Sequence, residues 1–431
     1  MKLLISTYAC APGRGSEHAV GWNWVTEAHR LGHQVWAFAS SAHRAAIETA
    51  CRDNPGLSGI HWTFPEVEFW PLHPATEPTW ERTYNLLWQR AALGHARELH
   101  RTVIFDAIHH LTWGGVRAPT FLGSLGPPLI MGPFGGGETS PKTLRDGFGL
   151  KARLTERIRD LSNATITLNP TVRGGLDAAS VIFVKTPDTR RLLTPAMRAK
   201  TVTFLELGLN EAQISTPRRN RAMQPRLLYA GRLLYWKGVH IAIRALEILL
   251  ERMPDARLTI VGDGPEENRL KTAARHLAGK VEFISRVPQT KLFELYASHN
   301  LLIYPSLHDS SGNVVMEALS SGMPVLCLDL GGPRDIVTPA SGIVVRTARL
   351  NTAGVAAAMA DEMVRLFADP SQLAALSAGA IARASEFLLS DRVAQLYEIV
   401  ANRIDLSNDN KGGPIRERAP QSLHDRVGAE S

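Results

Sequence analysis

Short runs of aliphatic and β-branched residues alternate along this chain with longer segments in which apolar residues recur at helical spacing. This alternation is typical of parallel sheets that are covered by helices. In the first half, helical patterns such as Glu17–Leu31 and Tyr84–His100 separate the short runs. The strands predicted there are Lys2–Thr7, Gln34–Ala39, Ala107–His110, Pro128–Gly132 and Val181–Val184.

The same pattern restarts at Arg226. The second set of predicted strands is Arg226–Ala230, Arg257–Val261, Val281–Ile284, Leu301–Tyr304, Val325–Leu328 and Ile343–Val345. The helices predicted between them are Val239–Glu251, Glu266–Leu277, Thr290–Ser298 and Val314–Ser321. Two such sets in tandem predict an α/β protein with two Rossmann-like, doubly wound domains.

The domain boundaries follow from changes in this pattern. Residues 208–224 are rich in Asn, Gln, Pro and Arg and have weak periodicity, so we place the first domain at 1–207 and the second at 208–388. A helix at 389–405 is expected to pack back on the first domain. Residues 406–431 are polar and aperiodic, which predicts a disordered tail.

Composition narrows the class of protein. The 44% of hydrophobic and 21% of charged residues are typical of a folded soluble protein. Cys10, Cys51 and Cys327 lack the spacing of a zinc site, and their odd number argues against disulfides, so a cytoplasmic protein is expected. The first residues read as a strand rather than a signal peptide, and no run reaches the ~20 apolar residues of a spanning helix. The net charge of +7 favours anionic ligands, but no nucleic-acid motif occurs.

The segment Ala230-Gly-Arg-Leu-Leu-Tyr-Trp-Lys-Gly-Val places two cations after a predicted strand. Ligands bind at the carboxyl edge of a doubly wound sheet, and Arg232 and Lys237 there would bind a diphosphate. The alternative is a solvated loop with two ordinary surface cations.

Two further turns follow predicted strands. Gly262 and Gly264 flank Asp263 and would let the backbone pass close to a ligand, although Asp263 could instead cap the next helix. Backbone groups near Arg286 and Val287 could bond a nucleobase edge.

The most specific segment is Pro305-Ser-Leu-His-Asp-Ser-Ser-Gly-Asn-Val-Val-Met-Glu, in which a strand leads through small residues into a helix. The free amide groups at the start of that helix suit a phosphate, and they belong to Ser311, Gly312, Asn313 and Val314. Glu317, one turn further on, could accept bonds from the two ribose hydroxyls. Asp309 is expected to face the donor sugar, unless it caps the helix instead.

Taken together, these motifs resemble the retaining glycosyltransferases of family 4, also called glycosyltransferase group 1, which have the GT-B fold. The family pattern is G-R-x(n)-K-G, G-x-G-P, R-V-P, E-x7-E, G-x-P-V and G-G-x-x-E-I-V, and the last element is Gly331-Gly-Pro-Arg-Asp-Ile-Val here. The resemblance is specific mainly over 226–337. It implies that two domains face each other across a cleft.

The resemblance also assigns roles. Arg232 and Lys237 would bind the diphosphate, Glu317 the ribose, and Asp309 takes the place of the first glutamate of E-x7-E. Asp is one methylene shorter than Glu, and Ser310-Ser-Gly replaces the usual Gly-Phe-Gly. We interpret this departure as a difference in donor-sugar fit rather than a loss of activity.

The first half resembles the acceptor domain less closely. Gly13, Gly15 and Ser16 follow the first strand and resemble the loop that faces the donor phosphates. His109 or His110 would contact the donor sugar or the reacting centre, and because the two point to opposite faces of a strand, one of them is structural. The remaining acceptor-side candidate is Glu138.

The segment Lys142–Leu161 is basic, and it contains Phe148, Leu150, Leu154, Ile158 and Leu161 at helical spacing. An amphipathic helix of this kind could lie on the inner face of an anionic membrane. The alternative is a solvated helix packed on its own domain.

The predicted function is transfer of a sugar from a UDP-, GDP- or ADP-sugar to a saccharide or lipid-linked acceptor, in polysaccharide or glycoconjugate biosynthesis. Retention is implied by the resemblance. No Asp-x-Asp motif is evident, so no metal or other cofactor is expected. The alternatives are a non-catalytic nucleotide-sugar-binding subunit and a sugar-nucleotide epimerase or phosphorylase on the same scaffold.

Overall fold

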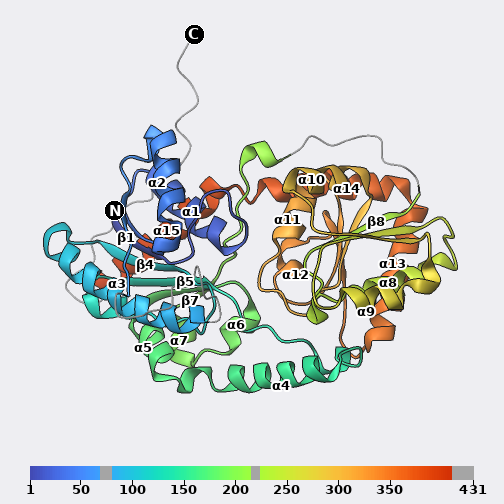
Figure 1. Ribbon diagram of the computed structural model, residues 1–431, viewed down its shortest axis with the longest axis horizontal. Helices are drawn as coiled ribbons and strands as arrows, with labels where there is room; N and C mark the ends of the chain where they lie inside the picture. The colour runs from blue at the N-terminus through green and yellow to red at the C-terminus, as the bar shows by residue number, and fades with distance from the viewer. Residues whose placement is uncertain (68–79, 215–223, 410–431) are drawn as a thin grey trace, which may run out of the picture.

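The computed structural model describes residues 1–67, 80–214 and 224–409, which form two α/β domains side by side (Figure 1). The first contains a seven-stranded parallel sheet in the order β3-β2-β1-β4-β5-β6-β7. Its strands are β1 (Lys2–Thr7), β2 (Gln34–Phe38), β3 (His61–Thr63), β4 (Ala107–Thr112), β5 (Leu129–Phe134), β6 (Ala179–Val184) and β7 (Thr201–Thr203). Its helices are α1 (Glu17–Arg30), α2 (Arg44–Asp53), α3 (Glu81–Val103), α4 (Leu150–Ala164), α5 (Pro170–Ala178), α6 (Pro187–Arg191) and α7 (Pro195–Ala199).

The second domain contains a six-stranded parallel sheet in the order β10-β9-β8-β11-β12-β13. Its strands are β8 (Arg226–Ala230), β9 (Arg257–Val261), β10 (Val281–Ile284), β11 (Leu301–Tyr304), β12 (Val325–Leu328) and β13 (Gly342–Val345). Its helices are α8 (Val239–Leu250), α9 (Glu267–Ala273), α10 (Gln289–Ser298), α11 (Asn313–Ser320), α12 (Pro333–Ile336), α13 (Thr352–Ala368) and α14 (Pro370–Ser385). This strand order is that of the Rossmann fold.

The predicted fold class is therefore confirmed, and every predicted strand is present. Two strands were not predicted, β3 and β7. Each has three residues and lies at an edge of the first sheet, so it offers too short a pattern for recognition. The predicted helix Glu266–Leu277 is a shorter α9 followed by a 3-10 turn at Arg275–Leu277.

The last helix returns to the first domain. Leu209 and Leu388 pair in a short parallel bridge where the chain leaves and re-enters that domain. From there α15 (Leu389–Asp409) buries Val393 and Tyr397 in the apolar core beneath β1 and β4. The first four residues of the expected tail at 406–431 continue α15 instead, because this helix ends at Asp409. The rest of that tail and part of the expected linker lie outside the described residues. Within the described part of the chain, no helix is both long and apolar enough to cross a bilayer.

The segment before α4, together with the start of that helix, joins the two domains. Leu144, Phe148 and Ala152 belong to the apolar core of the second domain although they precede it in sequence by many residues. Phe148 is only 4% exposed and meets Tyr235 edge-on at 5.0 Å. The expectation that Phe148 contributes to an exposed apolar stripe is therefore wrong, because this ring anchors the domain interface.

Glu156 on α4 is the polar centre of this interface. Its side chain is fully buried, and it accepts hydrogen bonds from the Tyr235 hydroxyl at 3.0 Å and His308 Nε2 at 3.2 Å in the second domain. Ser140 N–H donates to the other carboxylate oxygen at 3.1 Å. Burial raises the pKa of Glu156, but the bonds from His308, Ser140 and Tyr235 outweigh burial and lower the pKa to about 2.

The turn before α8 requires a glycine. Gly238 has φ 69°, and a Cβ at this position would lie 1.9 Å from the Pro305 carbonyl oxygen. This close approach brings the turn after β8 against the loop after β11.

We predict that Gly238→Ala lowers the free energy of unfolding by about 1–3 kcal/mol more than Gly279→Ala, because overpacking adds to the strain of a positive φ. Gly279 is a matched control, with φ 78° and nothing within 4 Å of an added Cβ. Urea unfolding of both variants measures the difference, and equal losses would contradict the account.

We also predict that Glu156→Gln lowers the free energy of unfolding by about 2–3 kcal/mol at neutral pH, since bonds to a buried charge are lost. A depressed carboxylate pKa stabilises the folded state above the ordinary value of 4.5, and this contribution disappears as the pH falls from 4.5 toward about 2. Thermal unfolding of wild type and variant should therefore converge over that range. The exposed Glu98→Gln is the control, and a gap that is the same at neutral and acidic pH would refute the prediction.

Candidate functional site

The candidate site lies where the strand order of the second sheet reverses. β8 and β11 are neighbours in the sheet, and their carboxyl ends lead to the Gly231–Gly238 turn and to the loop before α11. In open α/β sheets, ligands bind in the crevice at this switch point. The predicted cations and carboxylates on these two loops are therefore brought to one edge of the sheet.

Lys237 and Asp309 form the centre of the site. Lys237 Nζ lies 2.8 Å from Asp309 Oδ1 and 2.7 Å from Oδ2, and it donates to the Tyr304 hydroxyl at 2.9 Å. Tyr304 in turn donates to Asp309 Oδ2 at 2.7 Å. Burial raises the pKa of Tyr304 well above its usual range, so its hydroxyl stays a donor. Lys237 is thus held in one position by two neighbours.

Arg232 is the second cation of this turn. It is exposed, and within the described residues its guanidinium makes no ion pair. Tyr229 donates to the Arg232 carbonyl at 3.1 Å, which fixes the backbone while the side chain stays available to an anion.

The start of α11 lies beside this pair. Its N-cap is Gly312, and no side chain caps the first amide groups, so the alternative that Asp309 caps this helix does not hold. Ser311, Asn313 and Val314 lie at this uncapped end, where the helix dipole favours an anion. Gly332 N–H donates to the Asp309 carbonyl at 2.7 Å, so the motif that begins at Gly331 supports the loop from behind.

Glu317 lies one turn into α11 and is partly buried. Tyr296 donates to its Oε2 at 3.0 Å and the Gln289 side chain donates to Oε1 at 3.2 Å. Burial raises the pKa of Glu317, and these two bonds oppose the shift without cancelling it. The carboxylate is positioned on the same face of the sheet as the uncapped helix end.

The turn after β9 packs against the turn after β8. A Cβ on Gly262 would lie 2.0 Å from the Gly231 carbonyl oxygen, and one on Gly264 would lie 2.4 Å from that of Leu233. These glycines therefore let the turn after β9 pack closely on the neighbouring turn after β8. Asp263 is exposed and is not an N-cap, because α9 begins after Glu266. Beyond β10, Arg286 is exposed and Val287 half-buried at the same sheet edge.

In the first domain, Gly13, Gly15 and Ser16 form an exposed loop that leads into α1. Nothing lies within 4 Å of a Cβ added to either glycine, so the loop is open. Glu17, the next residue, accepts a hydrogen bond from Gly114 N–H at the carboxyl end of β4. The loop therefore lies at the switch point of the first sheet, between β1 and β4.

His109 and His110 do not reach a surface. His109 donates from Nε2 to the Gly132 carbonyl at 2.7 Å and accepts from the Tyr397 hydroxyl at 3.0 Å. Both rings are 0% exposed, and burial lowers the pKa of His109 to about 4 and that of His110 to about 3. The expected contact with a donor sugar is corrected for both residues, because each ring is enclosed between the sheet and its covering helices.

The expectation that Glu138 lies on the acceptor side is also corrected. Its Oε1 accepts from Thr189 at 2.9 Å and from Thr186, and its Oε2 accepts from Gly136 N–H at 2.8 Å. The residue is 4% exposed. It shapes the glycine loop after β5 and does not face an acceptor.

Two residues that the sequence reasoning missed lie at the domain interface. Lys185 follows β6 and pairs with Glu206 at 2.5 Å; burial lowers the pKa of Lys185, but Glu206 and nearby carboxylates outweigh burial and raise it. Gly135 packs against Ser310, since a Cβ there would lie 2.4 Å from the serine Oγ. The position of Lys185 directly after a strand was a usable signal.

Glu156 was also missed as a residue of the site. It binds His308, the neighbour of Asp309, and His308 stacks on Trp236, the neighbour of Lys237, with ring centroids 5.1 Å apart. The first domain therefore supports both loops of the site from beneath. In the described part of the chain, no group of three or more His, Cys, Asp or Glu side chains could hold a metal ion.

Comparison with known proteins agrees with this geometry. Residues 211–383 match the family model of the glycosyl transferases group 1. A glycogen synthase of Mycobacterium tuberculosis is 33% identical over 162 residues, which cover 37% of this chain and 39% of that protein. The chain thus matches about two fifths of the length of such relatives.

Solved structures extend the likeness to nearly the whole chain. Sucrose-phosphate synthase from Thermosynechococcus elongatus has a TM-score of 0.63 at 17% identity and covers 94% of this chain and 99% of its own. Alr3699/HepE of Anabaena, solved with UDP, has a TM-score of 0.58 at 17% identity over 93% of this chain and 100% of its own. At this identity the likeness establishes the fold. Residues 211–383 thus match the group 1 glycosyl transferases, and the chain as a whole has the GT-B fold.

Proposed function

We propose that this protein is a glycosyltransferase that moves a sugar from a nucleotide-diphosphate sugar to a saccharide or lipid-linked acceptor. The observation on which this proposal rests is the cluster of Lys237, Asp309 and Tyr304 beside the uncapped start of α11. A fixed cation and free amide groups at a sheet switch point suit a diphosphate. The match of residues 211–383 to the group 1 family model supports the same function.

The chemistry follows from where charge develops. Glycosyl transfer passes through an oxocarbenium-like state, so the leaving diphosphate gains negative charge as its bond to the sugar breaks. Lys237, Arg232 and the amide groups of α11 would stabilise this charge without a metal. Because Lys237 is already oriented by Asp309 and Tyr304, little reorganisation is needed when the leaving group forms.

Other residues of the second domain would bind the nucleoside of the donor. Glu317 would accept the ribose hydroxyls, and backbone groups near Arg286 and Val287 would bond the base. UDP-sugars are the first donors to test, since Anabaena Alr3699/HepE was solved with UDP-glucose. Transfer with retention in polysaccharide or glycoconjugate biosynthesis remains part of the proposal, as does a cytoplasmic location, supported by the free thiols of Cys10, Cys51 and Cys327. His109 and His110 are enclosed in the first domain and have no part in this proposed chemistry.

A thermal-shift screen over UDP-, GDP- and ADP-sugars should find a donor that stabilises the protein, by about 2.7 kcal/mol at a hundredfold excess over Kd. With that donor, Lys237→Ala should lower kcat by about 10²–10³, because a preorganised donor to the leaving group is lost. The control is Lys291→Ala, which removes an exposed cation on α10 whose ion pair is with its helix neighbour Glu294. Unchanged turnover in Lys237→Ala, or activity that chelators abolish, would contradict the proposal.

A second function deserves its own test because both oxygens of Asp309 are already bonded, to Lys237 and Tyr304. A carboxylate held in this way could leave the donor sugar uncontacted, as in a non-catalytic nucleotide-sugar-binding subunit. If the protein is an enzyme, wild type transfers sugar and Asp309→Glu lowers kcat, because the longer side chain displaces Lys237. If wild type binds UDP or GDP without transferring or hydrolysing any sugar nucleotide, and Asp309→Glu gains activity, the subunit is the correct function.

A further inference from the structure

We propose that the outer face of α4 docks on an anionic lipid bilayer. Four large apolar side chains follow each other along this helix at spacings of four, four and three residues, which places them on one face. They are Leu150, Leu154, Ile158 and Leu161, and they are 86%, 59%, 60% and 65% exposed. Leu168, in the 3-10 turn after the helix, extends the stripe and is 75% exposed.

This stripe is unusual for a folded surface. Single exposed apolar residues are ordinary, whereas a contiguous row of them marks an interaction surface. The described residues contain nine large hydrophobic side chains that are exposed, and five of them belong to this stripe. The helix α4 that carries the stripe runs along the lower edge of the molecule in Figure 1.

The opposite face of α4 explains why the helix cannot simply turn its apolar side inward. Ala152, Glu156 and Asn163 are buried on that face, and Glu156 binds the second domain. Turning the helix would break these contacts and expose a carboxylate that the fold satisfies completely. The apolar stripe is therefore held outward by the domain interface.

Cations flank the stripe on both sides. Arg153 and Arg157 each precede an apolar residue of the stripe by one position, and Lys151 lies on the other flank. With Lys142 they make four exposed cations, and none of the four forms an ion pair within the described residues. Of the three acids in this segment, Glu156 is buried, Asp160 pairs with Arg145, and Asp146 bonds to Thr352.

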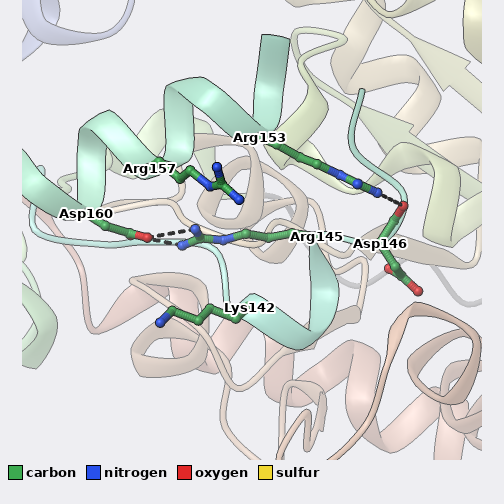
Figure 2. A pocket seen from close by; sticks show the side chains of 6 residues that line it. All are labelled: Lys142, Arg145, Asp146, Arg153, Arg157 and Asp160. Atoms are coloured by element: carbon green, nitrogen blue, oxygen red, sulfur yellow. Dashed lines mark hydrogen bonds and ion pairs between the residues drawn. The ribbon is translucent and has the colours of Figure 1, made fainter. Parts of the chain in front are cut away.

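A hollow of about 560 Å³ lies beside the helix. Figure 2 shows Arg153 and Arg157 extending from α4 toward the segment that holds Arg145 and Lys142. Arg145 is bonded to Asp160 at 2.7 and 2.9 Å, and Arg153 donates to the Asp146 carbonyl at 3.0 Å but has no carboxylate partner within the described residues. Lys142 and Arg157 make no side-chain bond within the described residues, so these three cations can receive an anionic headgroup at the edge of the stripe.

A lipid bilayer is the partner that matches both the apolar stripe and the cations beside it. A second copy of the chain could cover the apolar stripe, but it would place a second set of unpaired arginines against the first, with no exposed carboxylate on α4 to neutralise them. An anionic membrane buries the apolar side chains and pairs the cations with headgroups at the same time. The surface is separate from the nucleotide-sugar site, so the two proposals can fail independently.

The test is vesicle co-flotation of the whole protein with phosphatidylcholine alone and with phosphatidylcholine mixed with phosphatidylglycerol. Wild type should bind the anionic vesicles and not the neutral ones. The double variant Leu154→Ser with Ile158→Ser should lower the vesicle partition coefficient at least about ten-fold, because buried apolar area is lost. Ile104→Ser, which alters an exposed apolar residue outside α4, should bind like wild type.

A second double variant, Arg153→Gln with Arg157→Gln, tests the contribution of charge. It should lower the vesicle partition coefficient by about ten-fold or more. The control is Arg101→Gln with Arg275→Gln, which removes two exposed arginines outside α4. Thermal unfolding and nucleotide binding should be unchanged in every variant, which separates loss of docking from loss of the fold or the donor site. The proposal is overturned if wild type does not bind anionic vesicles, or if both α4 variants bind them as wild type does. It is also overturned if wild type is a dimer that the stripe variant converts to a monomer, since the stripe is then an interface between copies.

Discussion

The ion pair between Lys237 and Asp309 is the interaction on which the architecture of the site depends. The two residues are 72 positions apart and come from loops after β8 and β11, which only the reversed strand order makes neighbours. The pair forms because Gly238 lets the first turn approach Pro305 without a side chain in between. A cation held by a carboxylate and a tyrosine hydroxyl is oriented before any ligand arrives, and such preorganisation is what makes electrostatic stabilisation effective.

The fold could be predicted from sequence wherever a buried element has a clear pattern of apolar residues. β8, β9 and β11 are short, largely buried runs of mostly apolar residues, and their predicted limits are the observed ones. β3 and β7 have only three residues each and depend on the neighbouring strand for their pairing, so no local pattern identifies them. Tertiary context also explains Phe148, which has helical spacing with the stripe of α4 but enters the core of the second domain.

The site was predictable on one side of the domain interface and much less on the other. In the second domain, the motifs predicted that Lys237, Asp309 and Glu317 lie at one edge of the sheet. On the first, the strand with His109 ends in side chains that burial excludes from any ligand, and no local pattern distinguishes a buried histidine from a cleft histidine. Glu156 could not be recognised as a site residue from local sequence either, because its partners Tyr235 and His308 lie far along the chain.

The central claim is that Lys237 binds the diphosphate of a nucleotide sugar. The most direct test compares, by titration calorimetry, the affinity of a nucleoside diphosphate with that of the matching monophosphate, in wild type and in Lys237→Met. The base is the one whose sugar nucleotide stabilises the protein most. The account predicts that wild type prefers the diphosphate by about ten-fold or more, as a charge-assisted bond contributes, and that the variant loses most of this preference. An equal preference in both proteins would contradict it.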